Sequence, residues 1–364
     1  MDLTDLIDLE AQLARDRDAG AARVAARDAA IARRLPPEAR ADPARAVSRW
    51  VAALREAEPH RPFPGRAIAR ALRISSVVLF LIGLAFGWAL ATGLLAYDGT
   101  RPINVMDFLW VVVGVQLVLL VLLIGGFLAP RSMGRVPIAG DLRSLVGWLY
   151  PRLARRLGGI ERSETWTATL HRLRSRRSLY GRLEPWILLG LGQVFGIAFN
   201  LGVLLALVRL VVLTDLAFAW STTLQLEAEA FHGIVHALSV PWAWAWPEAA
   251  PSLALVEASR YSRLEAAYVA GGDPRVVGGW WPFLVAATVT YGLVPRTVAW
   301  VVARAQRARR LAGVRFDDVE TRRLVGRLSA PSVETRGLGR EPEDASAGGS
   351  APAPRLAYDG PCAA

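Results

Sequence analysis

Four long runs without a charged side chain constrain this chain more than any other feature. They occupy residues 74–97, 108–129, 186–208 and 276–295. Each run reaches the length, about 20 residues, that an α-helix needs to cross the hydrocarbon core of a bilayer. A crossing segment must also satisfy its own backbone hydrogen bonds, as a helix does. The sequence therefore predicts an all-α fold, an integral membrane helical bundle with four transmembrane helices.

The segments around these runs give the predicted domain organisation. The first two runs are joined by a short loop, so residues 74–129 predict a tight transmembrane hairpin. Apolar residues at helical spacing predict helices in the charged segments, and a tail rich in Pro, Gly, Ser and Ala predicts disorder. The other predicted regions are a helical region at 1–73, a basic loop with amphipathic helices at 130–185, an outer helical segment at 209–275, a helical extension at 296–330 and the tail at 331–364.

Arginine is distributed unevenly between these regions. All 43 basic residues of the chain are Arg. Residues 1–73 carry 14, residues 130–185 carry 12 and residues 296–364 carry 12, whereas the two outer loops carry one and four. Because Arg-rich loops stay on the cytoplasmic side of a membrane, we expect both termini in the cytoplasm. Residues 209–275 are then periplasmic, and the membrane is the inner membrane of a bacterium.

The runs also bear on which classes of function are open to the chain. None of them contains Asp, Glu, His or Arg, whereas proton pumps and most ion-coupled carriers need such a group at mid-membrane. The single cysteine, Cys362, makes no Cys-x-x-Cys motif, and a chain without Lys has no P-loop lysine. We therefore predict no enzyme activity and no cofactor. No basic stripe is interleaved with aromatic residues, so we predict no binding to nucleic acid.

The third run carries a stripe that is both small and polar. Gly192, Gly196 and Asn200 recur every four residues, and Gln193 lies seven residues before Asn200. Small residues let helices approach closely, and amides form hydrogen bonds between them. The stripe favours helix packing. A pore or ligand contact remains the alternative interpretation.

Three residues of the outer segment have the types that bind metals. Glu229, His232 and His236 share one face of a predicted helix near residues 225–239, at spacings of three and four. Imidazole and carboxylate groups bind divalent metals, but a site of this kind needs a further strong ligand, and none is evident. We therefore predict an ordinary helix face without a metal.

Three tryptophans follow in a stretch flanked by prolines. Trp242, Trp244 and Trp246 alternate along the chain, so in an extended segment all three indoles face one surface. Such a surface favours anchoring at the outer membrane interface. A platform on which a ligand stacks is the alternative.

The basic loop at 130–185 is the predicted docking surface. It holds twelve Arg and four acids, a net charge of +8. An amphipathic stretch at 141–157 has an apolar face that lipid or protein must cover. The densest cluster of positive charge is Arg172, Arg174, Arg176 and Arg177, and anionic lipid or an acidic protein surface would balance it.

Five short stretches carry a resemblance to a known family. They are FNLG at 199–202, DLAFAWSTTL at 215–224, PWAW at 241–244, EASRY at 257–261 and YGLVPR at 291–296. With them, most of residues 1–330 resembles the uncharacterised bacterial inner-membrane family catalogued as domain of unknown function 2868. That family commonly has Gly where this chain has Ala219. It implies no catalytic residues. It does imply a partner, because such proteins look to be encoded beside a cytoplasmic protein with a GTPase domain.

Together these features predict a non-enzymatic component of the membrane. Beyond the lipid bilayer, its expected partner is a cytoplasmic protein, and the resemblance points to a protein with a GTPase domain. The alternative is a transporter or channel subunit that uses the polar stripe of the third run.

Overall fold

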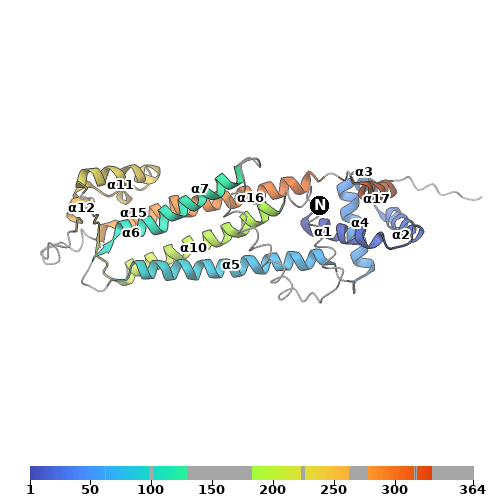
Figure 1. The fold of residues 1–364 in the computed structure, drawn as a ribbon, viewed down its shortest axis with the longest axis horizontal. Helices are drawn as coiled ribbons and strands as arrows, with labels where there is room; N and C mark the ends of the chain where they lie inside the picture. Colours follow the sequence, from blue (N-terminus) through green and yellow to red (C-terminus); the bar gives the residue numbers. More distant parts are fainter. Residues whose placement is uncertain are drawn as a thin grey trace, which may run out of the picture. The chain divides into compact units, whose positions relative to one another are not determined.

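The computed structural model describes most of the chain and shows it to be mainly helical (Figure 1). The elements below lie within the described residues, which are 1–61, 63–97, 102–128, 183–222, 226–261, 278–314, 316 and 318–329.

Four helices are long and apolar enough to cross a membrane, so the predicted helical membrane fold is confirmed to that extent. The first helix is α5 (Pro64–Leu94), and the third is α10 (Glu184–Leu213). The second and fourth are each built from consecutive helical pieces without a break. The second consists of α6 (Val105–Phe108), η1 (Leu109–Gly114) and α7 (Val115–Leu128). The fourth consists of η4 (Gly278–Trp280), α15 (Trp281–Ala287), η5 (Thr288–Leu293) and α16 (Val294–Ala312).

The second and fourth helices both contain a π-helical segment. These segments, η1 and η5, contact each other. A π-helical turn widens the helix by one residue, and such turns are frequent at functional sites. The region around this contact is therefore a candidate for a functional site.

Close packing between α5 and α10 depends on glycines. A Cβ atom added at Gly83 would lie 2.5 Å from the Phe195 carbonyl oxygen, and one at Gly87 would lie 2.0 Å from that of Phe199. On the other helix, a Cβ at Gly202 would lie 2.2 Å from the Leu84 carbonyl oxygen. The backbones of the two helices are thus in direct contact, as small residues at four-residue spacing predict.

Helices from both ends of the described chain form one charged helical domain. They are α1 (Leu3–Asp16), α2 (Ala21–Arg34), α3 (Pro37–Ala41), α4 (Pro43–Ala57) and α17 (Val319–Ser329). Asp2 and Asp42 cap α1 and α4 through their side chains, which fixes where these helices begin. Leu324 and Leu328 of α17 are fully buried in the core around Trp50. The sequence treats 1–73 and 296–330 as separate regions, and the structure joins them.

The charged helical domain is tied to the membrane helices through α1. The Gly65 amide, at the start of α5, donates a hydrogen bond to Asp8 Oδ1 at 2.6 Å. Arg55 of α4 donates to the other carboxylate oxygen of Asp8 at 2.6 Å. A small apolar cluster around the same point contains Leu3, Leu6, Ile7, Ile68 and Leu183.

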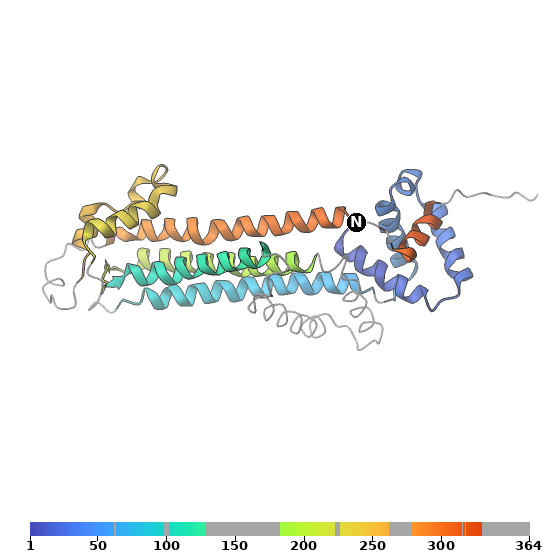
Figure 2. The same cartoon turned by 45° about the horizontal axis from the view of Figure 1, so that its top comes forward.

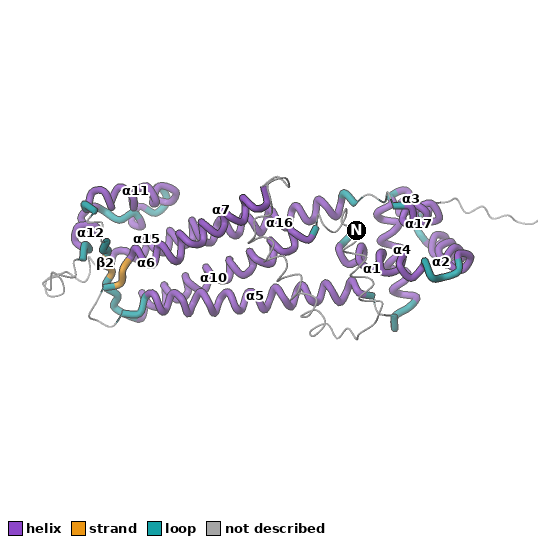
Figure 3. Tube along the Cα trace, viewed as in Figure 1, coloured by secondary structure: helices purple, strands orange, loops and turns teal. Residues whose placement is uncertain are grey.

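A second group of helices packs on the start of the fourth membrane helix (Figure 2). It comprises α11 (Ala228–Ala243), η3 (Pro247–Ala249) and α12 (Leu253–Ala258), and we call it the outer cap. Ser252 caps α12 by accepting from the Leu255 amide, which fixes where this helix begins. A short parallel sheet lies beside the cap (Figure 3), with β1 (Ile103–Asn104) paired to β2 (Phe218–Ala219).

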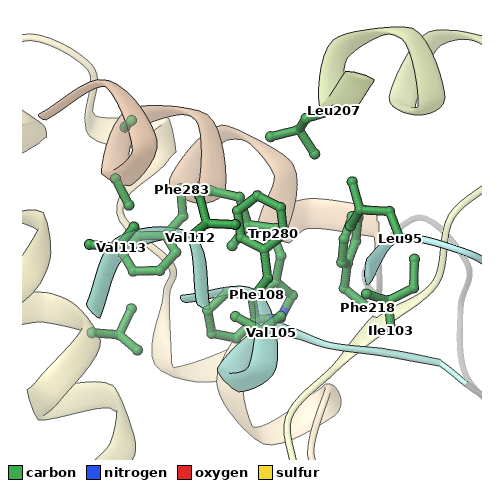
Figure 4. Close-up of a cluster of buried hydrophobic side chains, with 14 of the residues drawn as sticks. Leu95, Ile103, Val105, Phe108, Val112, Val113, Leu207, Phe218, Trp280 and Phe283 are labelled. Carbon is green, nitrogen blue, oxygen red and sulfur yellow. The ribbon is translucent and has the colours of Figure 1, made fainter. Parts of the chain in front are cut away.

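The core beneath the outer cap is aromatic. Phe108, Phe218, Trp280 and Phe283 are essentially fully buried and lie together in Figure 4. Trp220 stacks on Phe231 with ring centroids 4.3 Å apart. This core joins the loops between the membrane helices to the helices themselves.

The predicted extended arrangement of the three tryptophans is wrong. Helix α11 continues through Pro241 to Ala243, so successive side chains point in different directions. Trp242 is buried and donates to the Ala249 carbonyl at 3.2 Å, whereas Trp244 is 83% exposed. Trp246 lies edge-on to Trp281. The interface role of these tryptophans stays a prediction.

Candidate functional site in the membrane bundle

Two amides from different membrane helices form a reciprocal pair in the centre of the bundle. Asn200 Nδ2 donates to Gln116 Oε1 at 2.8 Å, and Gln116 Nε2 donates to Asn200 Oδ1 at 3.1 Å. Asn200 is fully buried and Gln116 is 7% exposed. Each amide also bonds a backbone carbonyl of its own helix, that of Gly196 for Asn200 and that of Val112 for Gln116. The pair is therefore well satisfied and links α7 to α10.

The fourth helix makes room for this pair through a glycine in η5. A Cβ atom added at Gly292 would lie 2.2 Å from Asn200 Oδ1, so no other residue fits there without moving the amide. Thr288, one turn earlier, is fully buried and donates to the Leu284 carbonyl at 2.7 Å. The amides of the second and third helices thus meet against Gly292 of η5 in the fourth helix.

One charged side chain joins the cluster from the fourth helix. Arg296 Nη2 donates to the backbone carbonyl of Gln116 at 3.2 Å. The stem of Arg296 lies against Gly196, because a Cβ atom there would be 3.1 Å from Arg296 Cδ. Together these contacts define one site, which we call the amide–arginine site and which consists of Gln116, Asn200, Gly196 and Arg296.

Arg296 lies beside the middle of α10, further into the bundle than the sequence predicts. The fourth run was predicted to end at residue 295, which places Arg296 in the cytoplasmic flank. Its neighbour Gly196 lies twelve residues after Glu184 and seventeen before Leu213, the ends of α10. At about 1.5 Å per residue, that is roughly 18 Å and 25 Å from those ends. Arg296 thus contacts α10 near the middle of that helix, a position that the end of the fourth run at residue 295 does not predict.

A local signal for this depth exists in the sequence. Residues 276–303 contain no charged residue other than Arg296. If Arg296 is counted as part of the apolar segment, that segment is 28 residues long. A helix of this length can cross a membrane with Arg296 inside it. Only the packing of the fourth helix against α10 distinguishes an Arg296 within the bundle from an Arg296 in the flank of the helix.

The predicted packing stripe of the third helix divides into three kinds of position. Asn200 and Gly196 belong to the amide–arginine site. Gln193 is 1% exposed, and its Oε1 atom has no hydrogen-bond partner among the described residues. At Gly192, no described atom lies within 4 Å of an added Cβ. The structure thus does not bring Gly192 into a close contact, and Gly83, Gly87 and Gly202 have that role.

Comparison with known proteins gives one match. Residues 153–360, more than half of the chain, match the family described as "Protein of unknown function (DUF2868)". The chain belongs to the DUF2868 family. No curated protein and no solved structure matches it. The DUF2868 match contains Gln193, Asn200 and Arg296, whereas Gln116 precedes it.

The two histidines that the sequence offers as possible metal ligands lie on α11 of this DUF2868 chain. His232 and His236 have ring centroids 5.9 Å apart, and Glu229 is in the first turn of the same helix. In the described part of the chain, no group of three or more His, Cys, Asp or Glu side chains is arranged to hold a metal. That no metal binds here stays a prediction.

The predicted docking residues of the DUF2868 chain lie outside the described residues. This applies to Arg172, Arg174, Arg176 and Arg177 and to the amphipathic stretch at 141–157. Their role stays a prediction.

Sequence analysis also missed a buried carboxylate in the charged helical domain. Asp28 is completely buried and accepts from Trp50 Nε1 at 3.0 Å. Arg27 and Arg327 both form ion pairs with it, at 2.7 and 2.8 Å. Arg327 belongs to α17, so this carboxylate holds the two ends of the described chain together.

Proposed function

We propose that this protein is a non-enzymatic component of the bacterial inner membrane that docks a cytoplasmic partner. The observation that carries the proposal is the charged helical domain. It is a folded domain with its own core, and Asp8 fixes it to the first membrane helix through the Gly65 amide. A domain anchored in this way presents a defined surface to a partner instead of a flexible tail.

The distribution of Arg supports a cytoplasmic position for this domain. Its two segments belong to the Arg-rich parts of the chain, residues 1–73 and 296–364, which the positive-inside rule assigns to the cytoplasm. Both termini are then cytoplasmic, and the outer cap faces the periplasm.

The helices that leave the bundle beside this domain are basic. Arg66, Arg70 and Arg73 are exposed on α5 at spacings of four and three, so they share one face. Arg304 and Arg309 are exposed on α16. Neither α5 nor α16 contains an acidic residue. A protein that docks here needs an acidic surface.

Residues 172–177 hold four more Arg, and the positive-inside rule assigns them to the cytoplasm as well. The resemblance to relatives encoded beside a GTPase-domain protein names the kind of partner. A nucleotide-dependent partner suits a fixed basic surface, because its own conformational change then alters how well its acidic groups match that surface.

Capture of the partner from mild detergent tests the proposal. The full-length protein is immobilised and exposed to the neighbouring GTPase-domain protein loaded with GTP or with GDP. We expect capture that weakens as salt is raised, because exposed charges are screened beyond about 8 Å at physiological ionic strength. We also expect capture to differ between the two nucleotides.

A variant with Arg172, Arg174, Arg176 and Arg177 replaced by Gln should insert normally and lose most of this capture. The matched control replaces Arg336, Arg340 and Arg355 of the tail by Gln, which lowers the net charge without touching the basic loop. Full capture by the quadruple variant would remove the docking role of the loop. Equal loss in both variants would show that net charge alone matters.

A transporter or channel subunit is the second candidate, and the amide–arginine site favours it. Buried polar groups at mid-membrane commonly mark the path of a substrate or ion. Flux of a small ion across liposomes that contain the purified protein, abolished by Asn200→Leu, would support this candidate over docking. Absence of any flux in the wild type would leave the amide pair with a packing role.

A further inference from the structure

Arg296 carries a permanent positive charge into the bundle. A guanidinium stays protonated in proteins and offers five N–H donors. Among the described residues, the one hydrogen bond of its side chain is to the Gln116 carbonyl. In the four membrane helices, Asp and Glu occur only near helix starts, as Asp107 of α6 and Glu184 of α10, and no described ion pair joins either of them to Arg296. The charge therefore has no carboxylate partner within these helices.

An unpaired charge at this depth is costly. Removing an ion from water costs several kcal/mol even after the protein relaxes, unless an opposite charge compensates it. The usual escape for Arg is to extend along the helix to the interface. Here the stem lies on Gly196 and the guanidinium bonds Gln116, so the group stays at the level of the buried amides.

Gln193 is a second polar group with unused hydrogen-bonding capacity on α10, the helix that Arg296 contacts. Gln193 is 1% exposed with an unpartnered Oε1, and it lies three residues before Gly196 on the face of α10 that Arg296 contacts. The oxygen and nitrogen of a side-chain amide exchange by a flip of the group. After that flip, N–H donors take the place of the unpartnered Oε1 atom.

We infer that Arg296 and Gln193 form an intramembrane binding site for a small inorganic anion such as chloride. An anion balances the charge and accepts from both groups, whereas water would satisfy the donors and leave the charge unbalanced. A lipid phosphate does not reach this depth, because headgroups lie about 15 Å from the bilayer centre.

This site is independent of the docking proposal. It uses no residue of the charged helical domain or of the basic loop. The protein can bind the anion whether or not it captures a partner.

The test uses the purified full-length protein in detergent with chloride or gluconate at constant ionic strength. A ligand that binds only the folded state raises its melting temperature as the ligand saturates. We expect chloride to raise the melting temperature by about 2–4 °C over gluconate. The line width of the ³⁵Cl NMR signal should increase when wild-type protein is added, which reports binding directly.

Arg296→Gln should abolish the chloride-dependent shift and the line broadening. Arg296→Lys keeps the charge and should retain both, with weaker binding. Gln193→Leu should weaken binding about tenfold, the effect of losing one hydrogen bond to a charged group. The matched control is Arg309→Gln, an exposed Arg of the same helix outside the site, which should behave as the wild type.

Two outcomes would overturn the inference. One is a wild-type protein that shows no broadening of the chloride signal. The other is broadening that persists in Arg296→Gln or disappears equally in Arg309→Gln, since chloride would then bind elsewhere. If Arg296→Gln does not fold, Arg296→Lys and Gln193→Leu still decide between a specific site and none.

Discussion

Asn200 and Gln116 donate a hydrogen bond to each other, at 2.8 Å and 3.1 Å, from two helices that are far apart in the sequence. The pair is buried, and each amide also bonds a carbonyl of its own helix. Removing one amide therefore leaves the other without its partner in an apolar setting.

The two amides should stabilise the bundle jointly. Asn200→Leu and Gln116→Leu are each expected to lower the free energy of unfolding by about 0.5–2 kcal/mol. The double variant should lose less than the sum, because both single variants remove the same interaction. Unfolding of all four proteins in detergent measures the coupling. Additive effects would show that the pair contributes no interaction energy.

Glycines of the α5–α10 contact should tolerate no side chain. Gly87→Ala places a Cβ 2.0 Å from the Phe199 carbonyl oxygen, so the helices must separate, at a cost of about 1–3 kcal/mol or more. Gly196→Leu should also destabilise, because it displaces Arg296. Gly192→Ala is the control. It meets no described atom within 4 Å and should be neutral or stabilising. Thermal unfolding in detergent separates these outcomes, and a tolerated Gly87→Ala would contradict the contact.

The buried carboxylate of Asp28 should hold the charged helical domain together. Asp28→Ala leaves the Trp50 indole N–H and the partly exposed Arg327 without their acceptor, while Arg27 keeps its second acceptor, Asp16. We expect a loss of roughly 2–4 kcal/mol, less than for a fully buried pair because solvent screens the two Arg. Proteolysis after α17 should become faster. Arg45→Ala breaks the exposed pair with Asp42 and should cost no more than about 0.5 kcal/mol.

The junction at Asp8 should give the protein a specific pH dependence. Burial raises the pKa of the Asp8 carboxyl, against the hydrogen bonds from Gly65 and Arg55 that lower it. The folded chain then keeps this proton at a pH where the unfolded chain, with a pKa of about 3.9, has lost it. The stability from this group is present below that pH and lost as pH rises through the folded pKa.

Melting temperatures of the wild type and of Asp8→Asn, measured from about pH 4 to neutral, check this sign. The wild type should lose stability relative to the variant as the pH rises. Parallel profiles would mean that the pKa of Asp8 is the same in the folded and unfolded chains.

The orientation of the bundle is tested by reporter fusions. Fusions after residue 20, near residue 160 and near residue 320 should report the cytoplasm, because these segments carry most of the Arg. A fusion near residue 250 should report the periplasm. A cytoplasmic signal at residue 250 would reverse the assignment of the outer cap.

The sequence by itself determined the four membrane helices and the small, polar face of α10 that includes Gly196 and Asn200. Both depend on local properties. Lipid rejects charge wherever it occurs, so a long charge-free run predicts a crossing helix without knowledge of its neighbours. A small residue at every fourth position likewise predicts a face on which another helix can pack.

Tertiary structure alone decided the depth of Arg296, the closure of the charged helical domain by α17 and the burial of Asp28. Each depends on which helix lies opposite and in which register. The apolar face of α17 could pack into many apolar grooves. The single charge of Arg296 is compatible with a position inside a span or at its edge. Packing of Arg296 against Gly196 and of Leu324 against the Trp50 core selects one arrangement, and no local pattern contains that information.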